Sequence, residues 1–127
     1  MATVEVTAAN FEELVDQNDI VVFDFWASWC GPCRSFAPIF EKTSERFPNI
    51  TFGKVNTEVE QALAANFEIR SIPTLMIIRE KVVLFSQAGA LPEEPLVNLL
   101  ESALALDMQE VHRQVQAQQS DEVPTKA

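Results

Sequence analysis

The alternation of apolar and polar positions predicts a chain built on short strands. Thr3 to Thr7 alternates as a strand with one buried face does. Ile20 to Trp26 is apolar on both faces apart from Asp24, a pattern typical of a central strand that helices cover on both sides. The remaining strands are expected at Ile50 to Asn56, Thr74 to Arg79 and Lys81 to Ala88, the last two forming a hairpin.

Apolar residues recur at helical spacing between these strands. Asn10 is expected to cap the first helix. Phe36, Phe40 and Phe47 mark the buried stripe of the second helix, and Pro38 inside it is expected to bend it. The helices are expected from Phe11 to Asp16, from Cys30 to Phe47, from Glu60 to Phe67, and through a stripe of Leu96, Leu99, Leu100, Ala103 and Leu104.

This order of elements is β-α-β-α-β-α-β-β-α. It predicts an α/β fold with one central mixed sheet of five strands, flanked by helices on both faces. The chain has 127 residues, of which 47% are hydrophobic, and this is enough for one core. We therefore expect one domain over residues 1–106 and a C-terminal extension over residues 107–127.

The extension carries helix signals of its own. Asp107 and Glu110 match a capping box, so the preceding helix is expected to break near Asp107 and a short helix to restart toward Gln116. From Gln118 onward the composition is polar, and fraying is expected. An apolar stripe either folds back on the body or contacts another chain; it consists of Leu104, Met108, Val111 and Val115.

The charge balance narrows the classes of partner. A formal net charge of −10 argues against nucleic acid, because phosphate binding needs clustered Lys and Arg. The start of the chain resembles no signal peptide, and the stretch from Ile20 to Ala27 is too short to cross a bilayer. We therefore expect a cytoplasmic monomer that binds neither nucleic acid nor membrane. Thiols are kept reduced in the cytoplasm, which favours a catalytic or metal-binding cysteine pair over a structural disulfide.

The two cysteines lie in the sequence Trp29-Cys30-Gly31-Pro32-Cys33. This spacing places both sulfurs on one side of a first helical turn, close enough to form a disulfide. The free N–H groups and the dipole at a helix start favour a thiolate. Cys30, at the cap, is expected to meet solvent and attack a substrate disulfide. Cys33, one turn inward, is expected to be shielded and to resolve the mixed disulfide.

Two other interpretations of the pair are weaker. A structural zinc site takes four ligands, but the chain has no further cysteine, and its one histidine, His112, lies in the extension. A structural disulfide across so short a loop would constrain little of the unfolded chain. The pair therefore predicts redox chemistry and no metal site.

The sequence FDFWASWCGPC, from Phe23 to Cys33, resembles the signature of the thioredoxin family. The resemblance covers about Val4 to Leu104 and implies the thioredoxin fold. Further matches are Lys54-Val55-Asn56 at the end of the third strand, Ile72-Pro73-Thr74 at the family's cis-proline, and Ala88-Gly89-Ala90 before the last helix of the domain. One departure is Arg79-Glu80-Lys81, where the family often has Asn-Gly, and this predicts a looser hairpin turn or one of another type.

The resemblance implies roles for the matching residues. Asp24 would exchange a proton with Cys33, since burial raises the pKa of a carboxyl and the Lys54 ammonium partly opposes that shift. A purely structural pair of Asp24 and Lys54 remains an alternative. Pro73 would follow a cis peptide bond. The substrate-binding surface would comprise Trp29, Gly31, Pro32, Ile72 and Gly89.

The resemblance also implies a function, that of a general protein-disulfide reductase. Such a protein binds no cofactor itself. It would draw electrons from NADPH through a flavin-containing thioredoxin reductase and pass them to client proteins with disulfides. A disulfide oxidase or isomerase would need an export signal and a more oxidising dipeptide than Gly-Pro. A scaffold or folding helper, whose C-terminal stripe binds a partner, remains the alternative from another class.

Overall fold

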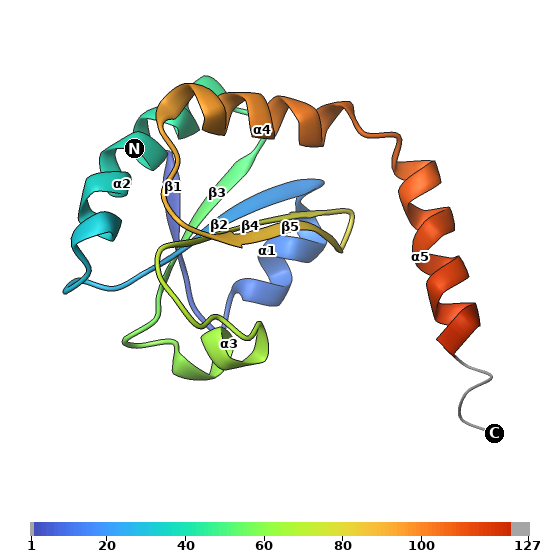
Figure 1. Ribbon diagram of the computed structural model, residues 1–127, viewed down its shortest axis with the longest axis horizontal. Coiled ribbons are helices and arrows are strands. Elements are labelled where there is room, and N and C mark those ends of the chain that lie inside the picture. The colour runs from blue at the N-terminus through green and yellow to red at the C-terminus, as the bar shows by residue number, and fades with distance from the viewer. Residues whose placement is uncertain (1, 123–127) are drawn as a thin grey trace.

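The computed structural model describes residues 2–122 and places a five-stranded sheet between two pairs of helices (Figure 1). The strand order is β1-β3-β2-β4-β5; β1 and β2 run parallel to β3, and β4 runs antiparallel to both β2 and β5. This is the mixed sheet predicted from the sequence. The elements are β1 (Thr3–Val6), α1 (Phe11–Gln17), β2 (Ile20–Trp26), α2 (Gly31–Arg46), β3 (Thr51–Asn56), α3 (Gln61–Asn66), β4 (Thr74–Arg79), β5 (Val82–Ala88), α4 (Glu93–Ala105) and α5 (Met108–Glu122).

The central strand β2 separates two apolar cores because its side chains alternate between the faces of the sheet. Val21, Phe23 and Phe25 pack toward α1 and α3. Ile20 and Val22 pack toward α2 and α4. On that second face the predicted aromatic stripe is buried as expected: Phe36 and Phe40 lie in α2, and Phe47 is the C-cap residue at its end.

The start of α1 differs from the prediction in its cap. The side chain of Asn10 accepts a hydrogen bond from the Thr7 N–H, at 2.7 Å, and donates one to the Glu5 carbonyl, at 2.9 Å. It makes no hydrogen bond to a free N–H of the helix. Asn10 therefore occupies the N-cap position that the sequence predicts, but its side chain does not cap the helix, because the turn from β1 into α1 uses both ends of its amide.

The turn between β4 and β5 is tight. Glu80 and Lys81 are its two central residues, with φ of 51° and 68°. Both therefore adopt the left-handed conformation that Asn-Gly favours in a two-residue hairpin. The predicted looser turn is wrong, since contacts from outside the hairpin support this one. The Glu80 N–H donates to the Asp19 carbonyl at 2.8 Å, and Lys81 pairs with Asp16.

The break between α4 and α5 falls where the sequence predicts it. Asp107 Oδ1 accepts hydrogen bonds from the N–H groups of Gln109 and Glu110, at 3.1 and 3.4 Å. The Glu110 carboxylate bonds Arg113 and Gln114 instead of returning to Asp107, so the capping box is only half formed. Helix α5 also runs past the predicted end near Gln116 and through residues 118–122. The predicted fraying beyond 122 lies outside the described residues.

The apolar stripe of α5 meets the body at its first turn. Met108 is buried, whereas Val111 and Val115 are half-buried. His112 Nε2 lies 2.7 Å from Glu80 Oε1 in the hairpin turn. Figure 1 shows α5 leaving the end of α4 at a steep angle. The prediction that the stripe folds back on the body is therefore confirmed for Met108. It is confirmed only in part for Val111 and Val115, which are half-buried.

Gly53 in β3 lies where a side chain does not fit, a constraint that the sequence analysis missed. A Cβ at this position would lie 2.6 Å from Val6 Cγ2 and 3.1 Å from Phe23 Cδ1. We expect Gly53→Ala to lower the free energy of unfolding by about 1–3 kcal/mol, because the two side chains must move in a packed core. Urea denaturation measures this. Gly31→Ala is the control, since a Cβ at Gly31 would lie 3.9 Å from Arg34 Nη2, which is ordinary contact. An equal loss of stability in both variants would contradict the steric explanation.

Candidate active site

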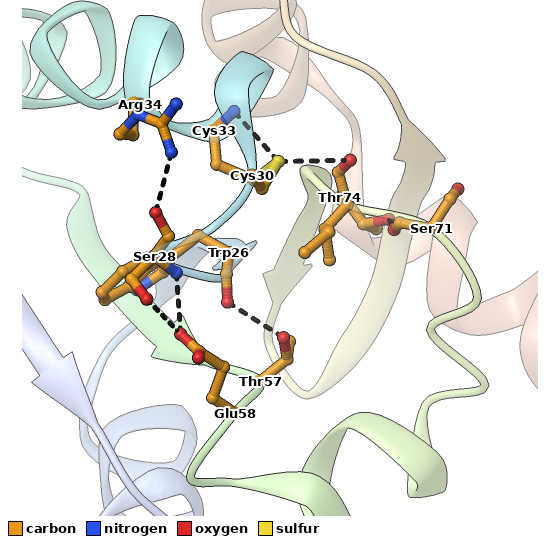
Figure 2. Close-up of a disulfide and its surroundings, with 10 residues drawn as sticks. Trp26, Ser28, Cys30, Cys33, Arg34, Thr57, Glu58, Ser71 and Thr74 are labelled. Atoms are coloured by element: carbon orange, nitrogen blue, oxygen red, sulfur yellow. Dashed lines mark hydrogen bonds between the residues drawn. A yellow bond between two sulfur atoms is a disulfide. The ribbon is translucent and has the colours of Figure 1, made fainter.

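The two cysteines lie at the start of α2, directly after the loop that leaves β2 (Figure 2). Cys30 is the N-cap residue, and its Sγ accepts a hydrogen bond from the Cys33 N–H at 3.2 Å. Pro32 lies in the first turn, where its missing N–H leaves no helical hydrogen bond unmade. Cys30 and Cys33 form a disulfide, with their Cα atoms 5.2 Å apart. The helix start therefore supplies the N–H groups that favour a thiolate when the disulfide is reduced.

The expected contrast in exposure between the cysteines is wrong. Cys30 is 4% exposed and Cys33 is 2% exposed. Ile72, 42 residues further along the chain, packs beside both of them, together with Trp26 and Ala27. The asymmetry lies elsewhere: Cys30 lines a surface groove, and Cys33 does not.

The groove has a volume of about 490 Å³. Trp29 forms part of its wall and is 69% exposed, which is unusual for so large an apolar side chain. Ile72 also lines the groove, and its carbonyl oxygen lies 3.7 Å from Cys30 Sγ. The groove is lined by Trp29, Cys30, Gly31, Pro32, Thr57, Ala64, Ile69, Arg70, Ser71 and Ile72.

The segment around Pro73 closes this side of the site. The peptide bond between Ile72 and Pro73 is cis, and Pro73 itself is buried. The Pro73 carbonyl accepts a hydrogen bond from the Gly89 N–H at 2.8 Å. Gly89 has a φ of 114°, and no atom lies within 4 Å of the position that a Cβ would occupy. Gly89 is thus bonded to Pro73, and it is not among the residues that line the groove.

Asp24 is fully buried in β2, on the same face as Trp26. Neither of its carboxylate oxygens has a hydrogen-bond partner among the described residues. Burial raises the pKa of Asp24 to about 7, and the positive charge of Lys54 partly opposes that rise. Lys54 lies beside Asp24 on β3, and its Nζ lies 5.2 Å from the centre of the Trp26 ring. The two residues are neighbours, but the described residues contain no ion pair between them.

A group of polar residues beside the cysteines was missed by the sequence analysis. Glu58, in the loop after β3, accepts hydrogen bonds from Ser28 at 2.7 and 2.8 Å. Arg34, in α2, donates to the Ser28 carbonyl at 2.9 Å. No spacing in the sequence marks this contact, because Ser28 and Glu58 are 30 residues apart and meet only when β2 and β3 pair.

The described part of the chain holds no group of three or more His, Cys, Asp or Glu side chains placed to bind a metal ion. None of its helices is both long enough and apolar enough to cross a membrane.

A disulfide of this spacing at a helix start, with one sulfur lining a groove, defines a dithiol–disulfide oxidoreductase. The model of the Thioredoxin family matches residues 2–102. This match contains both cysteines and all five strands. The chain belongs to the thioredoxin family, and it is a thiol–disulfide oxidoreductase that, like the family, needs no bound cofactor.

Individual relatives agree with this assignment. The chain is 51% identical to the "Putative thioredoxin 2" of Streptomyces coelicolor, over 94% of this chain and 89% of that protein. It is 40% identical to the thioredoxin of Haemophilus influenzae, over 75% and 91% of the two chains. Among solved structures, a mutant thioredoxin from Halobacterium salinarum superposes with a TM-score of 0.77 and 30% identity, over 82% of this chain and 92% of that chain. Because the match to the Streptomyces protein spans 94% of this chain, it includes at least part of α5.

Proposed function

We propose that this protein reduces disulfide bonds in client proteins. The Cys30 thiolate attacks one sulfur of the client disulfide, forms a mixed disulfide and releases the other client sulfur as a thiolate. Cys33 then loses its proton, and its thiolate attacks Cys30 Sγ. The bond between Cys30 and the client breaks, and the Cys30–Cys33 disulfide forms. Two electrons have then passed to the client, and two protons complete its thiols.

The position of Cys30 in the groove carries this proposal. Its Sγ lies 3.7 Å from the Ile72 carbonyl oxygen, so an extended client segment that bonds to the Ile72 backbone brings its disulfide to Cys30. Trp29, Gly31 and Pro32 also line the groove, and we assign them to the surface on which the client rests. We assign Pro73 and Gly89 to the support of the Ile72 backbone, because the Gly89 N–H bonds the Pro73 carbonyl.

Asp24 is the proposed proton acceptor for Cys33. Its pKa, raised to about 7 by burial, allows it to take up a proton and give it back near neutral pH. Lys54 is the proposed charge partner, since its ammonium keeps part of the Asp24 population ionised and ready to accept a proton. The unpaired Asp24 oxygens favour this role over a purely structural pair.

The partners follow from the chemistry. We propose thioredoxin reductase as the partner that restores the dithiol with electrons from NADPH, and cytoplasmic proteins with disulfides as the clients. We further propose that the protein acts there as a monomer, without nucleic acid or membrane. We also propose that residues 1–106 form the catalytic domain and 107–127 an extension; α4 ends at Ala105, next to this boundary.

Insulin reduction tests the proposal. With NADPH and thioredoxin reductase, the protein is expected to precipitate the insulin B chain while NADPH is consumed. Equilibration against dithiol buffers is expected to give a reduction potential near the value of about −270 mV typical of thioredoxins. A potential near about −180 mV, typical of protein disulfide isomerase, together with insulin left intact, would instead make the protein an oxidase or isomerase.

A further inference from the structure

Ser28, two residues before Cys30, is held from both sides (Figure 2). Its N–H and its hydroxyl both donate to Oε1 of Glu58, at 2.8 and 2.7 Å. Its carbonyl accepts a hydrogen bond from Arg34 Nη1 at 2.9 Å. All three polar groups of Ser28 are thus used, and each bond has a charged partner, which makes it stronger than a neutral one. We call these three residues the Ser28 clamp.

The clamp lies where the chain leaves the core. Ala27, before Ser28, is fully buried, and Trp29, after it, is 69% exposed. Ser28 is therefore the single residue between the buried Ala27 and the exposed Trp29. Within residues 2–122, the hydrogen bonds of this residue go to Glu58 and Arg34 alone.

Glu58 is itself fixed to the sheet. Its N–H donates to Asn56 Oδ1 at 2.9 Å, at the end of β3. The adjacent Thr57 donates to the Trp26 carbonyl from its N–H, at 2.8 Å, and from its hydroxyl, at 3.0 Å. The hydrogen bonds from Ser28 also lower the pKa of Glu58, so the acceptor stays ionised. The clamp is therefore anchored to the ends of β2 and β3.

We propose that Glu58 is a positioning residue, which holds Ser28 and so sets the Trp29 wall of the groove before a client binds. This inference rests on the proposed function, since it concerns how clients reach Cys30. A wall that is already ordered binds a client without the loss of loop freedom that a mobile wall would suffer. Glu58 is not among the residues that line the groove, so it is expected to act on client binding through Ser28 while the exchange at the sulfurs is left alone.

Two substitutions of Glu58 test the proposal. Both bonds from Ser28 end on one oxygen, so Glu58→Gln retains the acceptor, whereas Glu58→Ala removes it. For insulin, Glu58→Ala is expected to raise KM about fivefold and to change kcat less than about twofold. Glu58→Gln is expected to stay within about twofold of the wild type in both. Reduction of hydroxyethyl disulfide, which is too small to need the Trp29 wall, is expected to proceed at the wild-type rate in both variants.

Amide hydrogen exchange provides the direct readout. Exchange of the Ser28 N–H is expected to accelerate in Glu58→Ala and to stay slow in Glu58→Gln. Glu60→Ala is the matched control: this neighbouring carboxylate accepts a backbone bond from Ala8, away from the groove, and its loss is expected to leave KM unchanged. Ser28→Ala, which retains the N–H bond, is expected to give an intermediate KM and covers the case in which Glu58→Ala does not fold.

The outcomes distinguish a failure of this inference from a failure of the proposed function on which it rests. A wild-type KM in Glu58→Ala, or a Gln variant as impaired as the Ala variant, would overturn the positioning role and leave the reductase intact. An equal loss of hydroxyethyl disulfide reduction in Glu58→Ala would also overturn it, because the sulfurs themselves would then be affected. Failure of the wild type to reduce insulin would count against the proposed function instead.

Discussion

Cys33→Ser is expected to remain joined to its client through a stable disulfide at Cys30, while insulin turnover falls more than about 100-fold. The reason is positional. Cys30 lines the groove, where it would reach the client, whereas Cys33 does not line it and would contribute only the second attack. Non-reducing electrophoresis and mass spectrometry of the variant, mixed with an oxidised client, detect the complex.

Cys30→Ser provides the control for this experiment. The chain has two cysteines, so each single variant keeps one, and any complex reports on that residue alone. Cys30→Ser is expected to give no complex and no turnover, because Cys33 does not line the groove. Capture of clients by Cys33 at a comparable rate would reverse the roles of the two residues.

Asp24→Asn is expected to stabilise the protein in alkaline solution and to have a much smaller effect in acid. The folded state holds the pKa of Asp24 at about 7, against 3.8 for an ordinary aspartate. As pH rises from 3.8 to 7, the unfolded chain loses this proton and the folded chain keeps it, so the free energy of unfolding falls. At about 1.4 kcal/mol for each pH unit, the wild type is less stable by roughly 4 kcal/mol above pH 7 on this account.

Urea denaturation at about pH 5 and about pH 8.5 measures this effect. The difference in stability between Asp24→Asn and the wild type is expected to grow by about 3 kcal/mol between the two pH values. Glu45→Gln is the control, since its exposed carboxylate on α2 lies in water in both states. A difference that does not change with pH would show that Asp24 is already ionised in the folded protein.

The parts of the fold that the sequence predicts are those that local pattern determines. The apolar run of β2 requires cover on both faces, and the aromatic stripe of α2 requires one buried face; both hold in the structure. The cysteine pair was predictable for the same reason, since a spacing of two residues at a helix start places the sulfurs together whatever surrounds them.

The features that the sequence did not reveal depend on segments far apart in the chain. Cys30 was expected to be exposed, but Ile72, 42 residues away, covers it. The tight turn at Glu80 and Lys81 contradicts local preference because Asp16, in α1, and Asp19, in the loop after α1, support it. Likewise, Glu58 reaches Ser28 only across the pairing of β2 with β3. In each case the deciding contact is tertiary, and no local pattern encodes it.

The groove is assembled from three separate stretches of chain, at Trp29–Pro32, at Thr57 and between Ala64 and Ile72. They meet only after β2 has paired with β3 on one side and with β4 on the other. An unfolded chain keeps its cysteine pair but has no wall to hold a client against it. Catalysis can therefore serve as a reporter of the intact sheet: insulin reduction measured in increasing urea should follow global unfolding, whereas simple thiol reactivity should not.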